Sequence, residues 1–417
     1  MPEFRPFPAV RYAAGCDLDA VLAPPYDVLS DADVVALHGR DAHNITHVDV
    51  PEGQDYAQAG RILRDWLAAG VLMADSTETL TIYRMSFVDA SGAAREIVGV
   101  LGGLEVVDDV AGADNSRTTY GRSGRTTVLP HERTTPKATT DRLDLMRATS
   151  ANTSPVWGLS LASGLTEALR RPGEPLGSVV VDGVVHAVER VSDPDRIAAI
   201  QAIIAADDVL IADGHHRYSV SRTYRDQVRA ATGSADSAAE QTLTFVNELV
   251  DDQLSIEAIH RLYAGVAPEV LRSGLAGCFD FEPLGEVSPA TLAEMRALGR
   301  LVLLWPDGSA EWLVAKPGVF DDVRGLDGVW LETALAGVAV ETTYQHGLSE
   351  MISVVASGQY AAGVLIRPTS IQEIRRTARE GLLMPPKSTF FTPKLLTGWV
   401  IRPTEPLPAI ADTESVY

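Results

Sequence analysis

The strongest constraint on the fold is a segment in the middle of the chain, residues 207–218, which reads Asp-Asp-Val-Leu-Ile-Ala-Asp-Gly-His-His-Arg-Tyr. An apolar run ends at Asp213-Gly214, and apolar residues then recur at helical spacing. This order predicts a buried strand, a tight turn and a helix. The turn therefore carries several polar side chains at the start of a helix, a position suited to anion binding.

Two histidines and an arginine occupy the first turn of this predicted helix. Because a helix N-terminus is partially positive, a cation there costs about 0.3–1 kcal/mol. A phosphate would offset that cost by accepting from first-turn N–H groups and from Arg217. The helix dipole also favours neutral His215 and His216, each suited to act as a base or metal ligand. Asp213 could cap the helix, hold a metal ion or orient a histidine, and a plain solvated turn is the alternative reading.

Composition excludes several classes of protein. The 417 residues, 46% of them hydrophobic, suffice for two or three domains with real cores. A net charge of −21 argues against broad nucleic-acid binding and against an anionic membrane surface as partner. We find no signal-peptide pattern and no apolar stretch of roughly 18 residues. Cys16 and Cys278 lack disulfide or zinc spacing, so we expect a cytoplasmic protein.

Alternating strand and helix patterns predict an α/β (α+β) fold with mixed sheets and flanking helices. Residues 44–50 alternate as a strand does, and neither a P-loop nor a G-x-G-x-x-G fingerprint is present. We expect four segments: an N-terminal α/β unit (1–108), a polar glycine-rich loop (109–130), a central unit (131–265) and a C-terminal α/β unit with a lysine-bearing loop (266–417).

Further polar segments offer partners for the turn, and each also has an ordinary structural explanation. The rigid Pro24-Pro25 pair could place Asp27 as a base. Glu132, beside His131, is either an acid/base or metal ligand or a helix-entry carboxylate. Only four of the 35 basic residues are lysine, so lysine is expected where a compact ammonium is needed. A proline-rich C-terminal segment combines hydroxyls with two of these lysines: Lys387, Ser388, Thr389 and Lys394.

Five motifs, in order along the chain, resemble a prokaryotic family catalogued as a domain of unknown function; they occupy residues 23–28, 44–48, 130–134, 211–218 and 384–394. In addition, Asp-Gly-His-His-Arg (213–217) is similar to the signature of free-serine kinases of the ParB/sulfiredoxin superfamily. This resemblance implies a ParB/sulfiredoxin-like nucleotide-binding core in the central unit, with Mg²⁺. It points to Asp213, His215, His216 and Arg217 as the functional residues. The general base does not carry over, so Asp27 and Glu132 are candidates on chemical grounds.

The leading hypothesis is a Mg²⁺-dependent phosphotransferase that moves a phosphoryl group from ATP or ADP to the hydroxyl of a small metabolite, with free L-serine as the first guess. The expected catalytic residues are Asp213, His215, His216, Arg217, Glu132 and Asp27, with Asp213 also holding the metal. The expected phosphate-binding residues are Gly214, Arg217, Lys387, Ser388, Thr389, Lys394 and His131.

Two other classes remain open at this point: a ParB-like nucleotide-binding regulator that takes CTP, and a scaffold without a ligand site. Assembly into a homodimer is also left open. The phosphotransferase hypothesis makes a spatial demand, because the phosphate and the acceptor hydroxyl must meet. Lys387 or Lys394, together with Asp27 or Glu132, should lie at the 213–217 turn.

Overall fold

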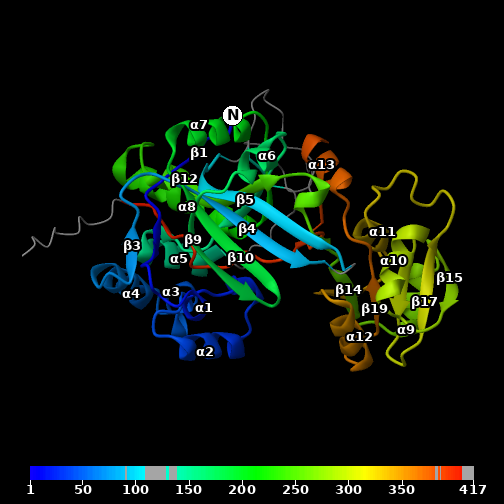
Figure 1. Ribbon diagram of the computed structural model, residues 1–417. Coiled ribbons are helices and arrows are strands. Elements are labelled where there is room, and N and C mark those ends of the chain that lie inside the picture. Colours follow the sequence, from blue (N-terminus) through cyan, green and yellow to red (C-terminus); the bar gives the residue numbers. More distant parts are fainter. Residues whose placement is uncertain (90–91, 109–127, 131–138, 381–383, 386, 406–417) are drawn as a thin grey trace, which may run out of the picture. The chain divides into compact units, whose positions relative to one another are not determined.

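The computed structural model describes residues 1–89, 92–108, 128–130, 139–380, 384–385 and 387–405 (Figure 1). These residues form two compact units. Unit 1 comprises the described parts of Met1–Ser255, Thr377–Leu383 and Pro393–Tyr417, and unit 2 comprises those of Ile256–Arg376 and Met384–Thr392. This division differs from the predicted boundaries, because strands from the predicted N-terminal and central units pair in one sheet.

Nine described strands form the mixed sheet of unit 1, with eight in the order β6-β11-β8-β12-β5-β4-β10-β9 and β1 paired to β5. The β11–β6 and β12–β8 pairs are parallel and the other pairs are antiparallel. The strands are β1 (Phe4–Arg5), β4 (Leu80–Val88), β5 (Ala94–Glu105), β6 (Val128–Pro130), β8 (Val156–Ser160), β9 (Glu174–Val181), β10 (Val184–Val191), β11 (Val209–Asp213) and β12 (Gln241–Glu248).

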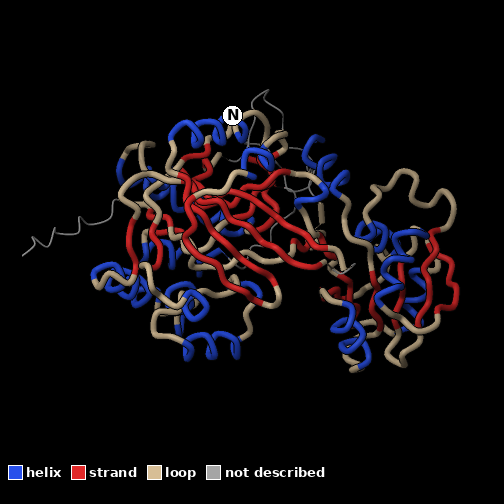
Figure 2. Tube along the Cα trace, viewed as in Figure 1, coloured by secondary structure: helices blue, strands red, loops and turns tan. Residues whose placement is uncertain are grey.

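Helices and short strand pairs surround this sheet, as the tube view shows (Figure 2). The helices are α1 (Leu18–Val21), α2 (Asp31–Arg40), α3 (Thr46–Asp49), α4 (Tyr56–Ala68), α5 (Thr139–Thr149), α6 (Leu165–Arg170), α7 (Pro194–Ile204) and α8 (His215–Thr232). Two short pairs join β2 (Val10–Tyr12) to β3 (Leu72–Ala74) and β7 (Ala151–Asn152) to β21 (Arg402–Pro403). The mixed sheet with flanking helices is the architecture that the sequence predicts.

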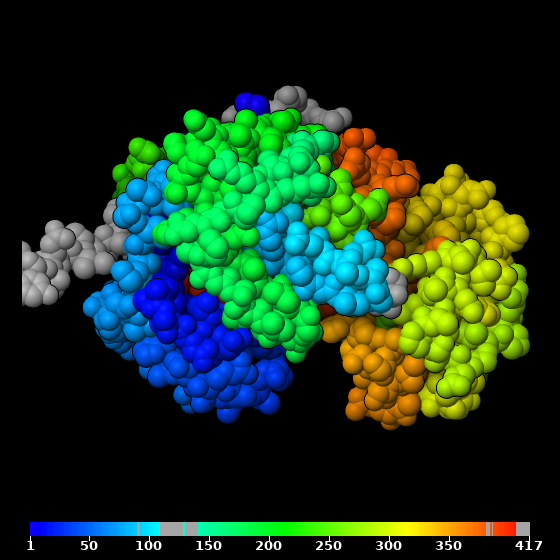
Figure 3. All heavy atoms as spheres, in the orientation of Figure 1, coloured from blue at the N-terminus to red at the C-terminus, as the bar shows by residue number. Residues whose placement is uncertain are grey.

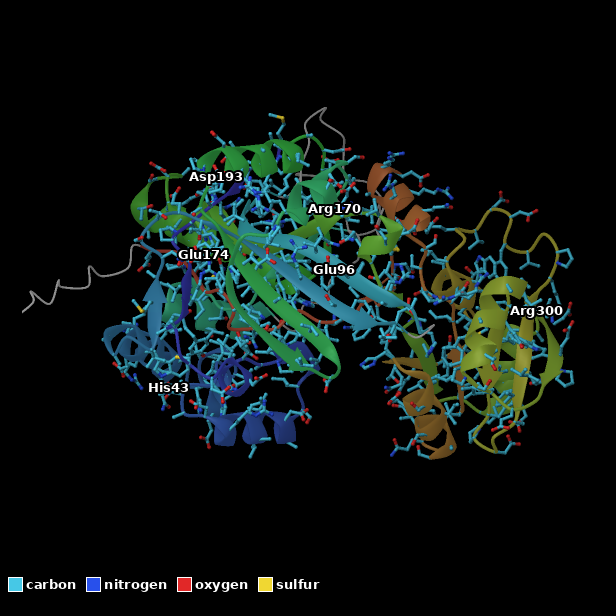
Figure 4. All side chains as sticks on the ribbon, in the orientation of Figure 1. His43, Glu96, Arg170, Glu174, Asp193 and Arg300 are labelled. Atoms are coloured by element: carbon cyan, nitrogen blue, oxygen red, sulfur yellow. The ribbon has the colours of Figure 1, made fainter. Side chains whose placement is uncertain are left out.

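Apolar side chains of the sheet and of the covering helices form the core of unit 1. Val209 and Ile211 of β11 pack with Ile200 of α7, Leu169 of α6 and Tyr218 of α8. The N-terminal helices are part of the same unit: α1 packs against β9, and the space-filling view shows these segments meeting at the surface (Figure 3). Charged side chains are left on the outside, among them Glu96, Arg170, Glu174 and Asp193 (Figure 4).

Two local predictions differ from the structure. The expected strand at 44–50 is instead the short helix α3, because the Asn44 side chain sets up a helical turn. Its Oδ1 accepts from the N–H and the Oγ1 of Thr46, at 3.1 and 2.6 Å. Asn and Thr favour such local bonds over a strand ladder. The end of the expected loop at 109–130 is the strand β6, since residues 128–130 pair in parallel with β11.

The last described segment of the chain, which follows Pro393, returns to unit 1 and pairs with its N-terminal part. Thr397 forms a bridge with Ala23, and Ile401 forms one with Val10. The turn in this segment needs glycine at Gly398, where φ is +102° and a Cβ would lie 3.0 Å from Leu22 Cδ2. Residues near the start and near the end of the sequence thereby come together in one unit.

Unit 2 is built on a six-stranded antiparallel sheet in the order β15-β17-β16-β19-β14-β18. Leu301 and Leu303 contribute to one core, and Val302 and Leu304 contribute to another, so the sheet is covered on both faces. Its elements are β13 (Ile256–Glu257), β14 (His260–Ala264), α9 (Pro268–Leu275), β15 (Phe279–Leu284), α10 (Pro289–Leu298), β16 (Leu301–Leu304), β17 (Ala310–Ala315), α11 (Asp327–Ala334), β18 (Glu341–Gln345), α12 (Leu348–Ala356), β19 (Ala362–Leu365) and β20 (Phe390–Phe391).

Helix α13 (Ile371–Glu380) spans the point at which the chain passes from unit 2 back to unit 1. No helix in the described ranges combines the length and the apolar character that crossing a membrane requires.

Candidate functional site

The predicted strand, turn and helix around residues 207–218 are confirmed as β11, Gly214 and α8. Gly214 is the N-cap of α8 and has left-handed backbone angles, φ 82° and ψ 29°. Glycine adopts these angles without steric cost. It is also needed for space, because a Cβ at Gly214 would lie 2.9 Å from Nε of Arg217. Glycine has no side chain that could accept a hydrogen bond from the first-turn N–H groups. Those N–H groups therefore need an acceptor other than the N-cap residue.

Arg217 is held in the first turn of α8 with only 9% of its side chain exposed. Its Nη2 donates to Oδ2 of Asp213 at 2.9 Å, and its Nη1 donates to the carbonyl oxygen of Pro155. Burial lowers the pKa of Arg217, but Asp213 and Asp27 outweigh that effect and raise it above its ordinary value. The Nε of Arg217 is buried and makes no hydrogen bond within the described part of the chain. The guanidinium is therefore fixed and charged, and its Nε–H has no acceptor among the described residues.

Asp213, at the end of β11, lies between two cations. Its Oδ1 is 3.5 Å from Nζ of Lys394, and its Oδ2 accepts from Arg217. Burial raises the pKa of Asp213, but Lys394, Arg217 and His215 together bring it well below its ordinary value. Asp213 therefore stays ionised, and it holds two cations at the start of α8.

Asp27 comes to the same place from the N-terminal part of unit 1. It lies in the short helix η1 (Tyr26–Val28) directly after Pro25, and its Oδ2 is 4.0 Å from Nη2 of Arg217. The Ala23–Thr397 bridge helps to explain why Asp27 and Lys394 both lie at the 213–217 turn, because it joins residues 23–28 to the segment that follows Pro393. Lys394 and Asp27 thus both lie at the 213–217 turn, which is the arrangement that the phosphotransferase hypothesis requires. Their chemical roles stay predictions.

The other predicted residues are distributed as follows. His215 and His216 are half-buried in the first turn of α8. Lys387 is exposed and belongs to unit 2, with a strained φ of 59°. Ser388 and Thr389 are buried in unit 2, and the Ser388 hydroxyl donates to the carbonyl oxygen of Pro385 at 2.7 Å. The phosphate-binding roles of these three stay predictions, and His131 and Glu132 lie outside the described residues.

Sequence reasoning missed a second group beside the turn. Arg142 of α5 stacks on Tyr26, with Cζ 3.3 Å from the ring centroid, and Arg217 lies 6.0 Å from the same centroid. Nη1 of Arg142 donates to Oδ1 of the buried Asp49 at 3.0 Å, and the Thr153 hydroxyl donates to that oxygen at 2.6 Å. The charges of α5 and the polar turn at 152–155 had ordinary surface explanations. The only sequence signal for this group is that Tyr26 lies within, and Asp49 directly after, a motif that resembles the family of unknown function.

A small cavity lies behind the first turn of α8. Its volume is about 30 Å³. Polar and apolar side chains line it: Arg142, Leu145, Met146, Ala151, Asn152, Thr153, Ser154, Arg217, Val220, Ser221 and Thr242.

A buried hydrogen-bond chain supports the segment that carries Lys394. The N–H of Leu396 donates to the Tyr83 hydroxyl at 3.0 Å, and that hydroxyl lies 2.8 Å from Nδ1 of His186. Burial lowers the pKa of His186 to about 4, so the imidazole is neutral at pH 7. The Tyr83 hydroxyl, whose lone pairs accept from Leu396, then donates to Nδ1.

Carboxylate donors for Mg²⁺ are limited at this site. The described residues hold no group of three or more His, Cys, Asp or Glu side chains arranged for a metal ion. Asp27 and Asp213 nevertheless meet the need of a Mg²⁺ ion that is held by one or two carboxylates, by water and by phosphate oxygens. Both oxygens of Asp213 contact cations, and Oδ2 of Asp27 lies 4.0 Å from one of them, Arg217.

Comparison with known proteins agrees with the recurring motifs. The family described as "Protein of unknown function (DUF1015)" matches residues 4–329. This chain belongs to the DUF1015 family. No curated protein sequence matches this DUF1015 chain significantly.

Among solved structures, the DUF1015 chain has a distant likeness to free serine kinase in complex with AMP (TM-score 0.36, 13% identity, covering 64% of this chain and 83% of that one). It is similarly related to SbnI with C-terminal truncation from Staphylococcus aureus (TM-score 0.34, 16% identity, 66% and 83% covered). A conserved hypothetical protein from Pyrococcus furiosus also resembles it (TM-score 0.34, 13% identity, 64% and 87% covered). At such values the reaction has to be inferred from the site itself.

Proposed function

We propose that this protein is a small-molecule kinase that transfers a phosphoryl group from ATP or ADP to the hydroxyl of a small metabolite, with free L-serine as the first acceptor to test. One observation carries the proposal: two cations, Lys394 and Arg217, meet at a glycine-capped helix start, with the carboxylate of Asp27 4.0 Å from Arg217. The resemblance of residues 213–217 to the free-serine kinase signature supports it.

The start of α8 is the phosphate end of the proposed site. The positive helix terminus, the Nε–H of Arg217 and the ammonium of Lys394 are suited to phosphate oxygens. Asp213 keeps both cations in place before the nucleotide arrives. Because phosphoryl transfer needs little more than positioning and charge stabilisation, these groups supply most of the required chemistry.

Asp27 is the proposed general base. Its side chain is 37% exposed, so a bound acceptor can reach it. The acceptor O–H bond breaks as its proton passes to the Asp27 carboxylate, and the oxygen forms a bond to the terminal phosphorus of the nucleotide. The bond from that phosphorus to its bridging oxygen breaks, and the electron pair leaves with the shortened nucleotide. A bound Mg²⁺ would neutralise charge on the phosphate oxygens.

The test is to incubate the purified protein with Mg²⁺, L-serine and either ATP or ADP, and to follow phosphoserine by mass spectrometry or ³¹P NMR. We expect phosphoserine together with an equal amount of ADP from ATP, or of AMP from ADP. A panel of hydroxyl metabolites should accompany serine. If no acceptor is phosphorylated with either nucleotide, the kinase proposal is wrong.

Ligand-induced shifts in melting temperature separate the remaining classes in the same experiment. A ligand present at 100 times its Kd adds about 2.7 kcal/mol to the free energy of unfolding. A shift with CTP but no acceptor turnover would favour a ParB-like regulator, and no shift with any nucleotide would favour a scaffold.

A further inference from the structure

We infer that Arg142 and the cavity beside it form a carboxylate-binding subsite, so that the acceptor is a small hydroxy acid held by its carboxylate end. This inference rests on the proposed function, because it concerns the acceptor of the same site.

The guanidinium of Arg142 is held from two sides. Its Nη1 donates to the main-chain oxygen of Asp49 at 2.8 Å and to its Oδ1 at 3.0 Å, and its plane stacks on the Tyr26 ring. The side chain is only 14% exposed. An arginine ordered in this way loses little further side-chain entropy when it binds a ligand.

The opposite edge of the same guanidinium remains available. All hydrogen bonds of Arg142 to described residues run from Nη1, which leaves Nε and Nη2. These two nitrogens form one edge of the planar group and present two parallel N–H bonds. Such an edge matches the two oxygens of a carboxylate in a bidentate pair.

The cavity that Arg142 and Asn152 help to line has the size and the donors for one carboxylate. Its volume of about 30 Å³ holds about two water molecules, the number of oxygen atoms in a carboxylate. Oδ1 of Asn152 accepts from the Leu243 N–H at 3.1 Å, which fixes the amide so that Nδ2 remains as a donor. Asn152 is 5% exposed, and its Nδ2 makes no hydrogen bond to another described residue. Asn152 therefore contributes a polar side chain to the wall of this cavity.

The position of this subsite fits the proposed reaction. Tyr26 contacts Arg142 on its ring face, has Arg217 6.0 Å from its ring centroid, and precedes Asp27 in the chain. A short hydroxy acid bound at Arg142 would therefore present its hydroxyl near Asp27 and near the phosphate end at Arg217. An acceptor without a carboxylate would not pair with Nε and Nη2 of this half-buried arginine and would bind more weakly.

Acceptor analogues test the inference with the full-length protein. L-serine and 3-hydroxypropionate both carry a carboxylate and a hydroxyl, whereas ethanolamine keeps the hydroxyl and the amine but lacks the carboxylate. We expect phosphorylation of the first two, and kcat/KM at least about 100-fold lower for ethanolamine. Equal kcat/KM for ethanolamine and L-serine would overturn the subsite while leaving the kinase proposal standing.

Arg142→Lys tests the subsite most directly. The lysine ammonium can still pair with Asp49, but it cannot present two parallel N–H bonds to a carboxylate. We expect KM for L-serine to rise about 10- to 100-fold, with kcat and KM for the nucleotide close to wild type. Arg147→Lys, at an exposed ion pair on the same helix, is the matched control and should leave all three constants unchanged. Unchanged KM for L-serine in Arg142→Lys would contradict the inference.

Binding without turnover keeps the two proposals distinguishable. Isothermal titration with L-serine and with lactate should give heat for wild type and much weaker binding for Arg142→Lys. If no acceptor is phosphorylated but this Arg142-dependent binding is present, the kinase proposal fails and the carboxylate subsite stands. Absence of binding in wild type would overturn the subsite.

Discussion

Nζ of Lys394 lies 3.5 Å from Oδ1 of Asp213, although the intervening chain builds the whole of unit 2. The contact joins a lysine from the last described segment to the turn between β11 and α8. It also leaves Asp213 with a cation on each oxygen, because Arg217 occupies the other one.

Lys394→Met should lower kcat at least about 100-fold, because it removes a cation from the phosphate end. It should also lower stability at pH 7. The pKa of Asp213 is depressed in the folded state, which contributes stability above the ordinary carboxyl pKa that is lost as pH falls through the folded value. Lys316→Met in unit 2 is the control, since Lys316 donates to the carbonyl oxygen of Ala276. Phosphoserine formation and urea unfolding measure both effects, and equal activity of the two variants would count against a role for Lys394.

Asp27→Asn should lower kcat by about 10²- to 10⁴-fold, because the acceptor hydroxyl loses its base. The melting temperature should change little, since Asp27 is more than one-third exposed. Asp31→Asn, an exposed carboxylate at the start of α2, is the control. A variant that retains wild-type kcat would show that another group is the base.

Gly214→Ala should reduce both stability and activity. A left-handed alanine costs about 1–2 kcal/mol, and here the new Cβ would also press on Arg217. Gly233→Ala is a close control at the other end of α8, because Gly233 has φ of 69° and nothing within 4 Å of its Cβ position. Both variants should lose similar backbone stability in urea unfolding, but only Gly214→Ala should lose activity. Equal activity would mean that Arg217 tolerates displacement.

The His186–Tyr83 pair predicts a pH-dependent stability. The folded pKa of His186 is about 4, against an ordinary 6.5, so the unfolded state takes up a proton first as pH falls. The contribution of His186 to the free energy of unfolding should therefore be complete above about pH 6.5. It should decrease by roughly 3 kcal/mol as the pH falls from 6.5 to 4.

His186→Asn keeps an acceptor for the Tyr83 hydroxyl but cannot titrate. Urea unfolding monitored by circular dichroism from pH 4 to 7 should show a smaller pH slope for this variant. His260 in unit 2, whose pKa burial also lowers to about 4, should preserve part of the slope. An unchanged slope would show that His186 does not contribute.

The sequence predicted the local architecture of the turn because its signals are local: an apolar run, a glycine and helical periodicity. It failed at residues 44–50, where the side chain of Asn44 begins a helix within an alternating pattern. The division into units was beyond such reasoning, because strand pairing across a sheet depends on contacts that are distant in sequence.

The same contrast holds for the candidate site. Asp213, Gly214 and Arg217 were found from their shared turn, and Lys394 from its unusual segment. Arg142 was not found, because a charged residue on a helix has the same local pattern whether it faces solvent or Tyr26. Its identification required the stacking and the bond to Asp49.

The bridge between Ala23 and Thr397 has a consequence for protein synthesis. A ribosome makes Asp27 early, Arg217 midway and Lys394 only after unit 2 has been translated. A nascent or truncated chain that stops before Pro393 cannot complete the set of charges around the turn, because it lacks Lys394. The full set of charges therefore assembles only late in translation, and shortened products of this gene would lack Lys394.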